Sequence, residues 1–248
     1  MANKIQQEYD ASRIYDLKQI QIKDGNHIVE LTRDNVARVE AMIRQDSKYS
    51  NSHNPHSKTS STYWLKQLKE VLIDNKSVSA AEYSKIISHC VETIDRENST
   101  RLKTDGVGRV EMAERLCKLD RNVLLQYLKK PKQNKYRLIE ILSKATCPKE
   151  SNKHARRNKS FASKFCHYAC MILFKGKKEQ DNFSIYDKIL RDNIPLYAGQ
   201  YDIKIPRGFS TSYSKYISVI DQIIKKSGNK ISRNGFDHLL WYFHKAQK

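Results

Sequence analysis

Lys164 and Asp187 are the residues of this 248-residue chain whose types and placement could support covalent chemistry. Lys164 lies in the amphipathic stretch "RNKSFASKFCHYACMILF" (157–174), among small and apolar neighbours. An amine attacks an electrophilic carbon only in its neutral form, so a nucleophilic lysine needs a lowered pKa. A carboxylate held nearby can stabilise positive charge that develops during the attack. Together the two residues suggest an amine nucleophile assisted by a fixed carboxylate.

The predicted helix around Lys164 places its side chain at the edge of the core. With Ser160 as the N-cap, Lys164 is the fourth helical residue, and a rotation of 100° per residue puts it about 60° from Phe161. The positive end of the helix, partial desolvation and nearby cations all disfavour the ammonium form. These cations are Arg156, Arg157 and Lys159. The alternative is a lysine whose alkyl chain lies along the core edge while its ammonium group reaches solvent.

Asp187 follows the apolar residues "FSIY" and stands at the expected start of the next helix. A carboxylate at that place accepts hydrogen bonds from unpaired backbone N–H groups. Asp187 is therefore either a helix cap or a fixed carboxylate at the mouth of a pocket near Lys164.

The elements that must position these side chains are helices. The chain has only 8 Gly and 5 Pro, and its apolar residues recur with helical spacing, which predicts an all-α protein. The "NP" dipeptide lies in a polar loop (47–62), and 201–209 is the expected extended piece. Helices are expected over 31–46, 63–74, 79–97, 110–130, 134–147, 157–174, 212–227 and 234–246, with another after residue 182.

The polar loop also suggests how the chain is organised. We expect an N-terminal helical segment with this loop over 1–62, and a helical core over 63–248. The length allows one fairly large domain or two closely packed subdomains. The region of interest, about 135–195, lies inside the core.

The charge of the chain favours a polyanionic partner. Its 46 Lys and Arg against 27 Asp and Glu give a net charge of +19 and a pI near 9.6. Residues 129–178 carry fifteen Lys and Arg against Glu140 and Glu150, a net charge of +13 in one fifth of the chain. Such a block is typical of phosphate contact, and the connector "SNKHARRNKS" would bring phosphate to a helix N-terminus. The alternative is a basic face that only keeps the protein soluble.

The cysteines and the apolar runs limit the class of protein further. Five cysteines without a CxxC pair indicate neither a disulfide framework nor a zinc site. The N-terminus lacks the apolar core of a signal peptide, and "ACMILF" (169–174) is too short to span a bilayer. We expect a soluble cytoplasmic protein with reduced thiols and no metal or other cofactor.

The residues around Lys164 and Asp187 carry a resemblance. "SFASKFCHY" followed by "FSIYDK" resembles the core of the helix-hairpin-helix DNA glycosylase superfamily, and is most similar to its bacterial 8-oxoguanine glycosylase-like branch. In that family a lysine opens the helix after the hairpin, and an aspartate follows a short apolar segment downstream. The resemblance covers about 135–195 and implies an all-α fold with two helical subdomains flanking a basic cleft.

The resemblance also implies roles for individual residues. Lys164 matches the lysine that attacks the sugar C1′, and Asp187 matches the aspartate that assists loss of the base. The expected DNA contacts are Lys153, Arg156, Arg157, Lys159, Ser160 and Ser163. The expected base-pocket residues are His167, Tyr186 and Trp241. Three further aromatic residues are candidates for base stacking: Trp64, Tyr197 and Tyr213. For these three, and for Tyr186 and Trp241, the alternative is a place in the core.

Two departures from the family pattern bear on the substrate. "KHARRN" replaces the glycine-rich hairpin turn, so arginine side chains would replace some backbone amides as phosphate ligands. Lys164 and Asp187 are 23 residues apart, a longer spacing than this branch leads us to expect, with the basic insert "FKGKKEQDN" between them. The insert could reshape the pocket or add a DNA contact. The absence of a cysteine cluster argues against the iron–sulfur members of the superfamily.

The function implied by the resemblance is a DNA glycosylase with AP lyase activity. It would flip a modified base out of double-stranded DNA and excise it, either in base-excision repair or in bacterial defence against phage DNA with hypermodified bases. Two alternatives come from other classes: a non-catalytic helical DNA-binding protein, and an all-α protein–protein module with a basic surface.

Overall fold

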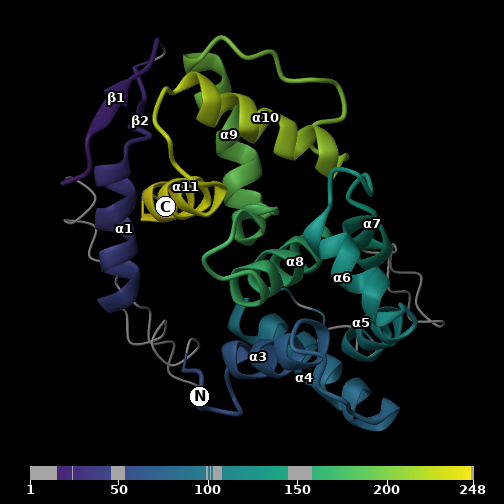
Figure 1. Ribbon diagram of the computed structural model, residues 1–248. Coiled ribbons are helices and arrows are strands. Elements are labelled where there is room, and N and C mark those ends of the chain that lie inside the picture. The colour runs from purple at the N-terminus through teal and green to yellow at the C-terminus, as the bar shows by residue number, and fades with distance from the viewer. Residues whose placement is uncertain are drawn as a thin grey trace, which may run out of the picture.

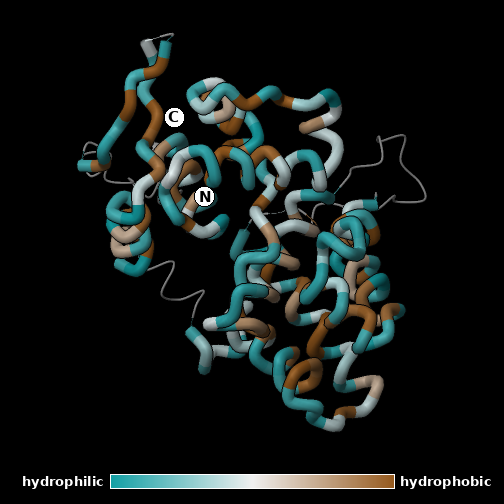
Figure 2. The backbone as a smooth tube through the Cα atoms, turned by 45° about the horizontal axis from the view of Figure 1, so that its top comes forward, coloured by the Kyte–Doolittle hydropathy of each residue, from teal (hydrophilic) through white to brown (hydrophobic). Residues whose placement is uncertain are grey.

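The computed structural model describes residues 16–23, 25–45, 54–98, 100, 102, 108–144 and 158–246, and it is mostly helical. The described helices and strands form two groups, one toward the upper left and one toward the lower right of Figure 1. Hydrophobic and hydrophilic stretches alternate along the helices in Figure 2, as amphipathic helices require. The expected all-α class is confirmed.

The first group is built around helix α8. Helix α8 packs against α3, α4, α6 and α7, and α5 covers α4 and α7. Its inner face is fully buried and consists of Phe161, Phe165, Ala169 and Leu173. The helices of this group are α3 (Ser61–Leu72), α4 (Ala80–Asn98), α5 (Gly108–Cys117), α6 (Arg121–Lys129), α7 (Arg137–Ser143) and α8 (Lys159–Leu173).

The second group joins the two ends of the described chain. Helix α1 (Arg33–Gln45) packs against α11 (Arg233–Ala246), and α11 packs against α9 (Lys188–Gln200) and α10 (Tyr213–Lys226). Two short antiparallel strands, β1 (Gln19–Gln21) and β2 (His27–Val29), precede α1. A Cβ atom on Gly235 would stand 2.9 Å from Cγ1 of Val36, so only glycine permits this approach of α11 to α1.

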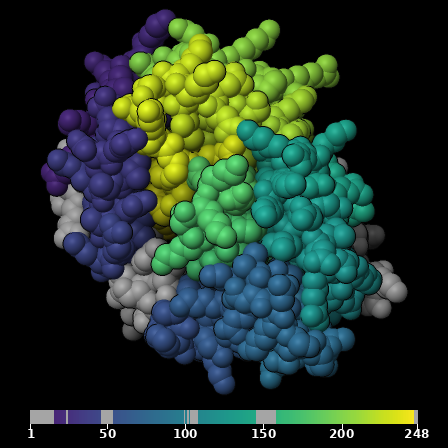
Figure 3. Space-filling view, viewed as in Figure 1, coloured from purple at the N-terminus to yellow at the C-terminus, as the bar shows by residue number. Residues whose placement is uncertain are grey.

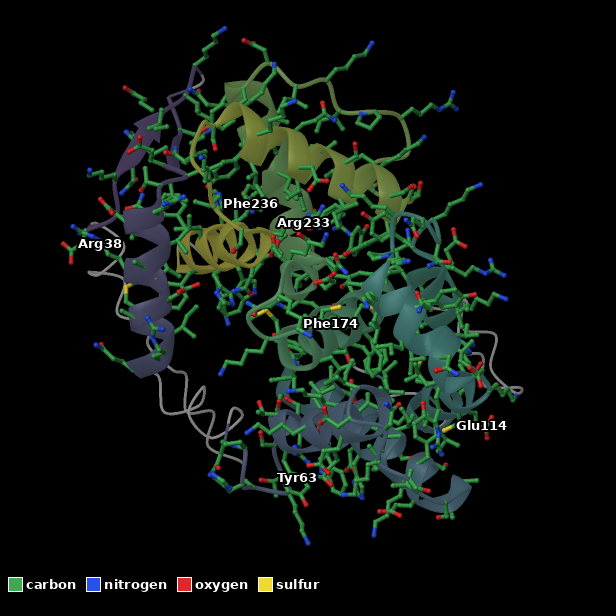
Figure 4. The ribbon with its side chains drawn as sticks, viewed as in Figure 1. Arg38, Tyr63, Glu114, Phe174, Arg233 and Phe236 are labelled. Atoms are coloured by element: carbon green, nitrogen blue, oxygen red, sulfur yellow. The ribbon has the colours of Figure 1, made fainter. Side chains whose placement is uncertain are left out.

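The two groups are connected through the chain that follows α8. In Figure 3 the green surface around this part of the chain lies between the blue surface of α3 and α4 and the yellow surface of α11. The short helix η3 (Lys178–Asp181) packs on α8. Arg233 connects the start of α11 to the end of η3 and to α10. It donates to the carbonyls of Asp181 and Asn182 after η3, and to both carboxylate oxygens of Asp221 on α10. Figure 4 shows Arg233 near the centre of the molecule, with Phe174 below it.

The structure corrects several element boundaries. The single helix expected over 110–130 is two helices, α5 and α6, because Asp120 starts a new helix by accepting hydrogen bonds from the amides of Asn122 (2.8 Å) and Val123 (3.3 Å). Helix α7 begins only at Arg137, since Lys135 and Tyr136 adopt left-handed backbone conformations. These interruptions allow α5, α6 and α7 to fold back on one another.

Four further features differ from expectation or refine it. The β1–β2 hairpin was not predicted. Residues 203–206 lie between turns and form no strand. The division of the chain expected between residues 62 and 63 falls inside the first turn of α3, whose N-cap is Ser60. The N-terminal α1 belongs spatially with the C-terminal helices, because its closest partner is α11.

Replacing Asp120 with alanine should destabilise the protein by about 1 kcal/mol, because the first amides of α6 lose their acceptor. Chemical denaturation of the wild-type protein and the variant measures this difference in the free energy of unfolding. Asp120→Asn is the matched control and should stay close to wild type, since asparagine caps helices equally well. Equal loss in both variants would mean that the charge, and not the cap, stabilises α6.

Candidate functional site

The N-cap of helix α8 lies two residues before the expected cap, Ser160. Its N-cap is Asn158, whose carbonyl accepts the first intrahelical bond from the amide of Ala162 at 2.9 Å. Ser160 is therefore the second helical residue and not the cap, and Lys164 is the sixth residue and not the fourth. The Asn158 side chain forms no capping hydrogen bond. Lys164 thus lies in the second turn of the helix, farther from the positive end than the sequence suggested.

The Lys164 amine points to the end of α4. Its Nζ donates to the main-chain carbonyl of Asn98 at 3.2 Å, and the hydroxyl of Tyr168, one turn along α8, donates to Asn98 Oδ1 at 2.9 Å. Burial lowers the pKa of Lys164, and the positive charge of Lys245 on α11 lowers it further, whereas the Asp187 carboxylate raises it. The direction of the net shift is downward, as a nucleophilic amine requires.

Asp187 is the N-cap of α9, as the sequence predicted. Its Oδ1 accepts a hydrogen bond from the amide of Leu190 at 2.9 Å. The carboxylate also lies within electrostatic reach of Lys164. Among the described contacts no direct ion pair joins the two side chains, because Lys164 bonds to Asn98 and Asp187 bonds to α9. Asp187 therefore caps its helix and acts on Lys164 electrostatically at the same time.

The extended residues 183–186, here called the FSIY segment, connect η3 to Asp187 and pass through the interior. Two residues of α8 hold its ends. Nδ1 of His167 donates to the carbonyl of Phe183 at 2.9 Å, and Oγ of Ser163 accepts from the amide of Tyr186 at 2.9 Å. Burial lowers the pKa of His167, so the ring is held neutral with its proton on Nδ1.

The middle of the FSIY segment is held by α10 and α11. The Tyr213 hydroxyl accepts from the amide of Ser184 at 3.0 Å and donates to its carbonyl at 2.6 Å. Asp237 accepts from the amide of Ile185 at 2.7 Å, and the Tyr216 hydroxyl donates to the Ile185 carbonyl at 2.7 Å. Side chains thus replace the sheet partners that a buried extended segment would otherwise need.

The residues predicted to contact DNA differ in their exposure, and three of them lie outside the described residues. Lys153, Arg156 and Arg157 lie outside the described residues. Lys159 is partly exposed; its amine donates to the carbonyl of Thr211 and stands 5.5 Å from the centre of the Tyr186 ring. Ser160 is partly exposed in the first turn of α8. Ser163 is fully buried and bonds within the protein, so its predicted contact with DNA is wrong.

The predicted base-pocket residues are mostly interior. His167 and Tyr186 are buried, and the Tyr186 hydroxyl donates to the carbonyl of Ser210. Both therefore support the FSIY segment and offer no open ring face. Trp241 is only partly buried, and the Lys245 amine lies 4.2 Å from the centre of its ring. Of the three residues, Trp241 alone keeps the exposure that contact with a base would need.

The three further aromatic residues are all buried, as their alternative predicted. Trp64 stacks on His89 at 4.0 Å and donates to the carbonyl of Lys58. Tyr197 joins β2 to α11, because its hydroxyl accepts from the amide of Val29 and contacts Nε2 of His244. Tyr213 holds the FSIY segment from within.

A basic groove of about 720 Å³ lies beside the start of α8. It carries three lysines against one glutamate, so an anion fits it better than a cation. The groove reaches Lys159 but neither Lys164 nor Asp187. Its lining residues are Lys135, Tyr136, Ile139, Glu140, Ser143, Lys144, Lys159, Thr211, Ser212, Tyr213 and Ser214.

No family model, curated protein or solved structure matches this chain at a significant level. Within the part of the chain that the structure describes, none of the helices has the length and apolar character needed to cross a membrane. The same residues contain no group of three or more His, Cys, Asp or Glu side chains placed to hold a metal ion.

Replacing Asp187 with asparagine should lower the pKa of Lys164 further, because the carboxylate that favours its ammonium form is lost. The cap of α9 is kept, since asparagine also caps helices. NMR titration of ¹³Cε-labelled lysine, with Lys164→Gln used to assign the signal, measures the change. Asp192→Asn removes an exposed carboxylate on the same helix and should leave the Lys164 pKa unchanged. An unchanged pKa in Asp187→Asn would contradict the electrostatic contact.

Proposed function

We propose that this protein is a DNA glycosylase with AP lyase activity that removes a modified base from double-stranded DNA. Lys164 is the nucleophile and Asp187 is the supporting carboxylate. The observation that carries the proposal is the partly buried amine of Lys164, whose pKa is lowered by burial within electrostatic reach of Asp187. The all-helical architecture in two groups supports the resemblance of residues 135–195 to the helix-hairpin-helix glycosylases.

The contacts of Lys164 suit an amine nucleophile. A neutral amine can donate an N–H to the Asn98 carbonyl and still direct its lone pair at another atom. In the proposed reaction the target base leaves the duplex, and the Lys164 nitrogen bonds to the sugar C1′ as the glycosidic bond breaks. The base departs with the bonding electrons and takes up a proton. The bonded amine then loses a proton, and the C1′–O4′ bond breaks as O4′ takes up a proton, which leaves a protonated Schiff base between Lys164 and C1′. Loss of a proton from C2′ expels the 3′ phosphate by β-elimination and so cleaves the strand.

Asp187 suits the charge that this reaction develops. Breaking the glycosidic bond makes the sugar positive, and a carboxylate close to the sugar stabilises that charge. The hydrogen bond from Leu190 fixes the orientation of the carboxylate without neutralising its charge. The carboxylate would therefore be ready before substrate binds, so little reorganisation is needed during the reaction.

The distribution of charge suits DNA as the partner. The net charge of the chain is +19, and the groove beside the start of α8 carries Lys135, Lys144 and Lys159. Phosphates neutralised by lysine or arginine release bound counterions, so the affinity for DNA should fall as salt rises.

Lys164→Gln should abolish covalent trapping on DNA and reduce base release at least about 100-fold, because the nucleophile is lost. Duplexes carrying different oxidised or hypermodified bases are incubated with the protein. Released bases are detected by mass, and borohydride traps the Schiff base. Lys188→Gln, which removes a neighbouring exposed lysine charge, is the matched control and should trap as the wild type does.

Wild-type trapping by Lys164→Gln would overturn the assignment of the nucleophile. Salt-dependent DNA binding without release of any base would instead favour a non-catalytic DNA-binding protein. The base that is released separates the two biological roles: an oxidised base indicates repair, whereas a hypermodified cytosine indicates defence against phage. Plating phages with modified and unmodified cytosine on expressing cells tests the second role.

A further inference from the structure

Asp237 of α11 is a buried acid that the proposed reaction does not yet use. It is 1% exposed, and Oδ2 accepts from the amide of Ile185, two residues before Asp187. Neither Oδ1 of Asp237 nor Oγ of Ser184 has a hydrogen-bond partner in the described structure. The two side chains are neighbours, since the Ser184 hydroxyl interacts with the Asp237 carboxyl. The remaining polar atoms of Ser184, in the FSIY segment, and of Asp237, on α11, thus lie close together.

A hydrogen bond between these groups would satisfy both atoms, and the Ser184 hydroxyl can either donate to a carboxylate or accept from a carboxylic acid. An ionised carboxylate buried here would accept from the Ile185 amide and the Ser184 hydroxyl but would have no cation beside it, which is costly. A neutral carboxylic acid can accept from the Ile185 amide with one oxygen and donate to the Ser184 hydroxyl with the other.

The surroundings of Asp237 favour the neutral acid. Burial raises the pKa of Asp237 well above its usual range, and the carboxylates of Asp181 and Asp187 raise it further. The hydrogen bonds from the Ile185 amide and the Ser184 hydroxyl lower it, but the net direction is upward. The other titratable groups that face it are the hydroxyls of Tyr213 and Tyr216 on α10, and burial raises their pKa values as well. No positive charge among these groups offsets the cost of a carboxylate.

We propose that Asp237 is a positioning residue: as a neutral acid it bridges the Ile185 amide and the Ser184 hydroxyl, and so fixes where Asp187 stands relative to Lys164. The position of Asp187 depends on the FSIY segment, because only Tyr186 separates it from Ile185. Ser163 holds Tyr186 from α8, the same helix that carries Lys164. The bridge therefore joins α11 to the pair of functional residues.

This inference rests on the proposed function, and a pair of variants tests it. Asp237→Asn keeps an acceptor for Ile185 and a donor for Ser184, so base release should stay within about threefold of wild type. Asp237→Leu has a similar shape but neither group, so Ile185 loses its acceptor and Asp187 shifts. Base release should fall at least about tenfold, since small misplacements of a reacting group cost that much.

A second activity readout separates positioning from general damage. Borohydride trapping on a duplex with a preformed abasic site needs Lys164 but no departing base. In Asp237→Leu this trapping should stay within about threefold of wild type while base release falls. Parallel loss of both activities would indicate a merely structural role and overturn the proposal. Loss of base release in a folded Asp237→Asn would show that the ionised carboxylate is required, which also overturns it.

The pKa of Lys164 provides a test that needs no catalysis. In Asp237→Leu the NMR titration of Lys164 should shift downward as in Asp187→Asn, because the carboxylate moves away, and Asp237→Asn should match wild type. If wild type releases no base from any duplex, the proposed function fails while this shift still tests the bridge. An unchanged pKa of Lys164 in Asp237→Leu overturns the proposed bridge even where base release is confirmed.

One more variant covers the case in which Asp237→Leu does not fold. Tyr216→Phe removes only the hydroxyl that donates to the Ile185 carbonyl. It should give a smaller shift of the Lys164 pKa in the same direction. No shift in Tyr216→Phe, together with a shifted Lys164 in Asp237→Asn, overturns the proposal.

Discussion

The backbone of the FSIY segment must find hydrogen-bond partners in the protein interior, and much of the arrangement around the site depends on this. An extended segment in a sheet bonds to neighbouring strands, whereas this one passes between helices. Buried amides and carbonyls without partners would cost several kcal/mol in total. The partners are side chains of three helices, α8, α10 and α11, which supply a serine, a histidine, two tyrosines and an aspartate. Satisfying one short segment therefore fixes how these three helices lie relative to one another.

The hydrogen bonds of the FSIY segment, and not a direct contact, determine how Lys164 and Asp187 are placed relative to each other. Each has its own local partner, the carbonyl of Asn98 for the amine and the amide of Leu190 for the carboxylate. Their interaction is electrostatic and acts across the junction of the two helical groups. Neither group is therefore held by an ion pair with the other.

The sequence predicted the parts of the site that depend on local patterns. Helix α8, the start of α9 and the capping role of Asp187 follow from apolar spacing and from one aspartate before a helix. The carbonyl of Asn98 could not be predicted, since any main-chain oxygen has the same sequence signal. The cap at Asp120 was missed because the apolar period runs on through it. Asp237 did carry a signal: it lies on the buried face of α11 next to Phe236 and Leu240, where a lone acid is unusual.

The close contact of α1 with α11 at Gly235 has a consequence for how the protein folds. Residues near positions 36 and 235 must meet, and the groups that hold the FSIY segment are themselves spread from 163 to 237. Contacts between distant parts of a chain require a large loop to close, which costs entropy before the contact stabilises the structure. Such contacts therefore tend to form late and to slow folding. The arrangement around Lys164 should therefore be absent from any partly folded form. A chain that has not completed folding would lack the burial that lowers the pKa of Lys164, so the lysine would acquire its unusual environment only when the last contacts form.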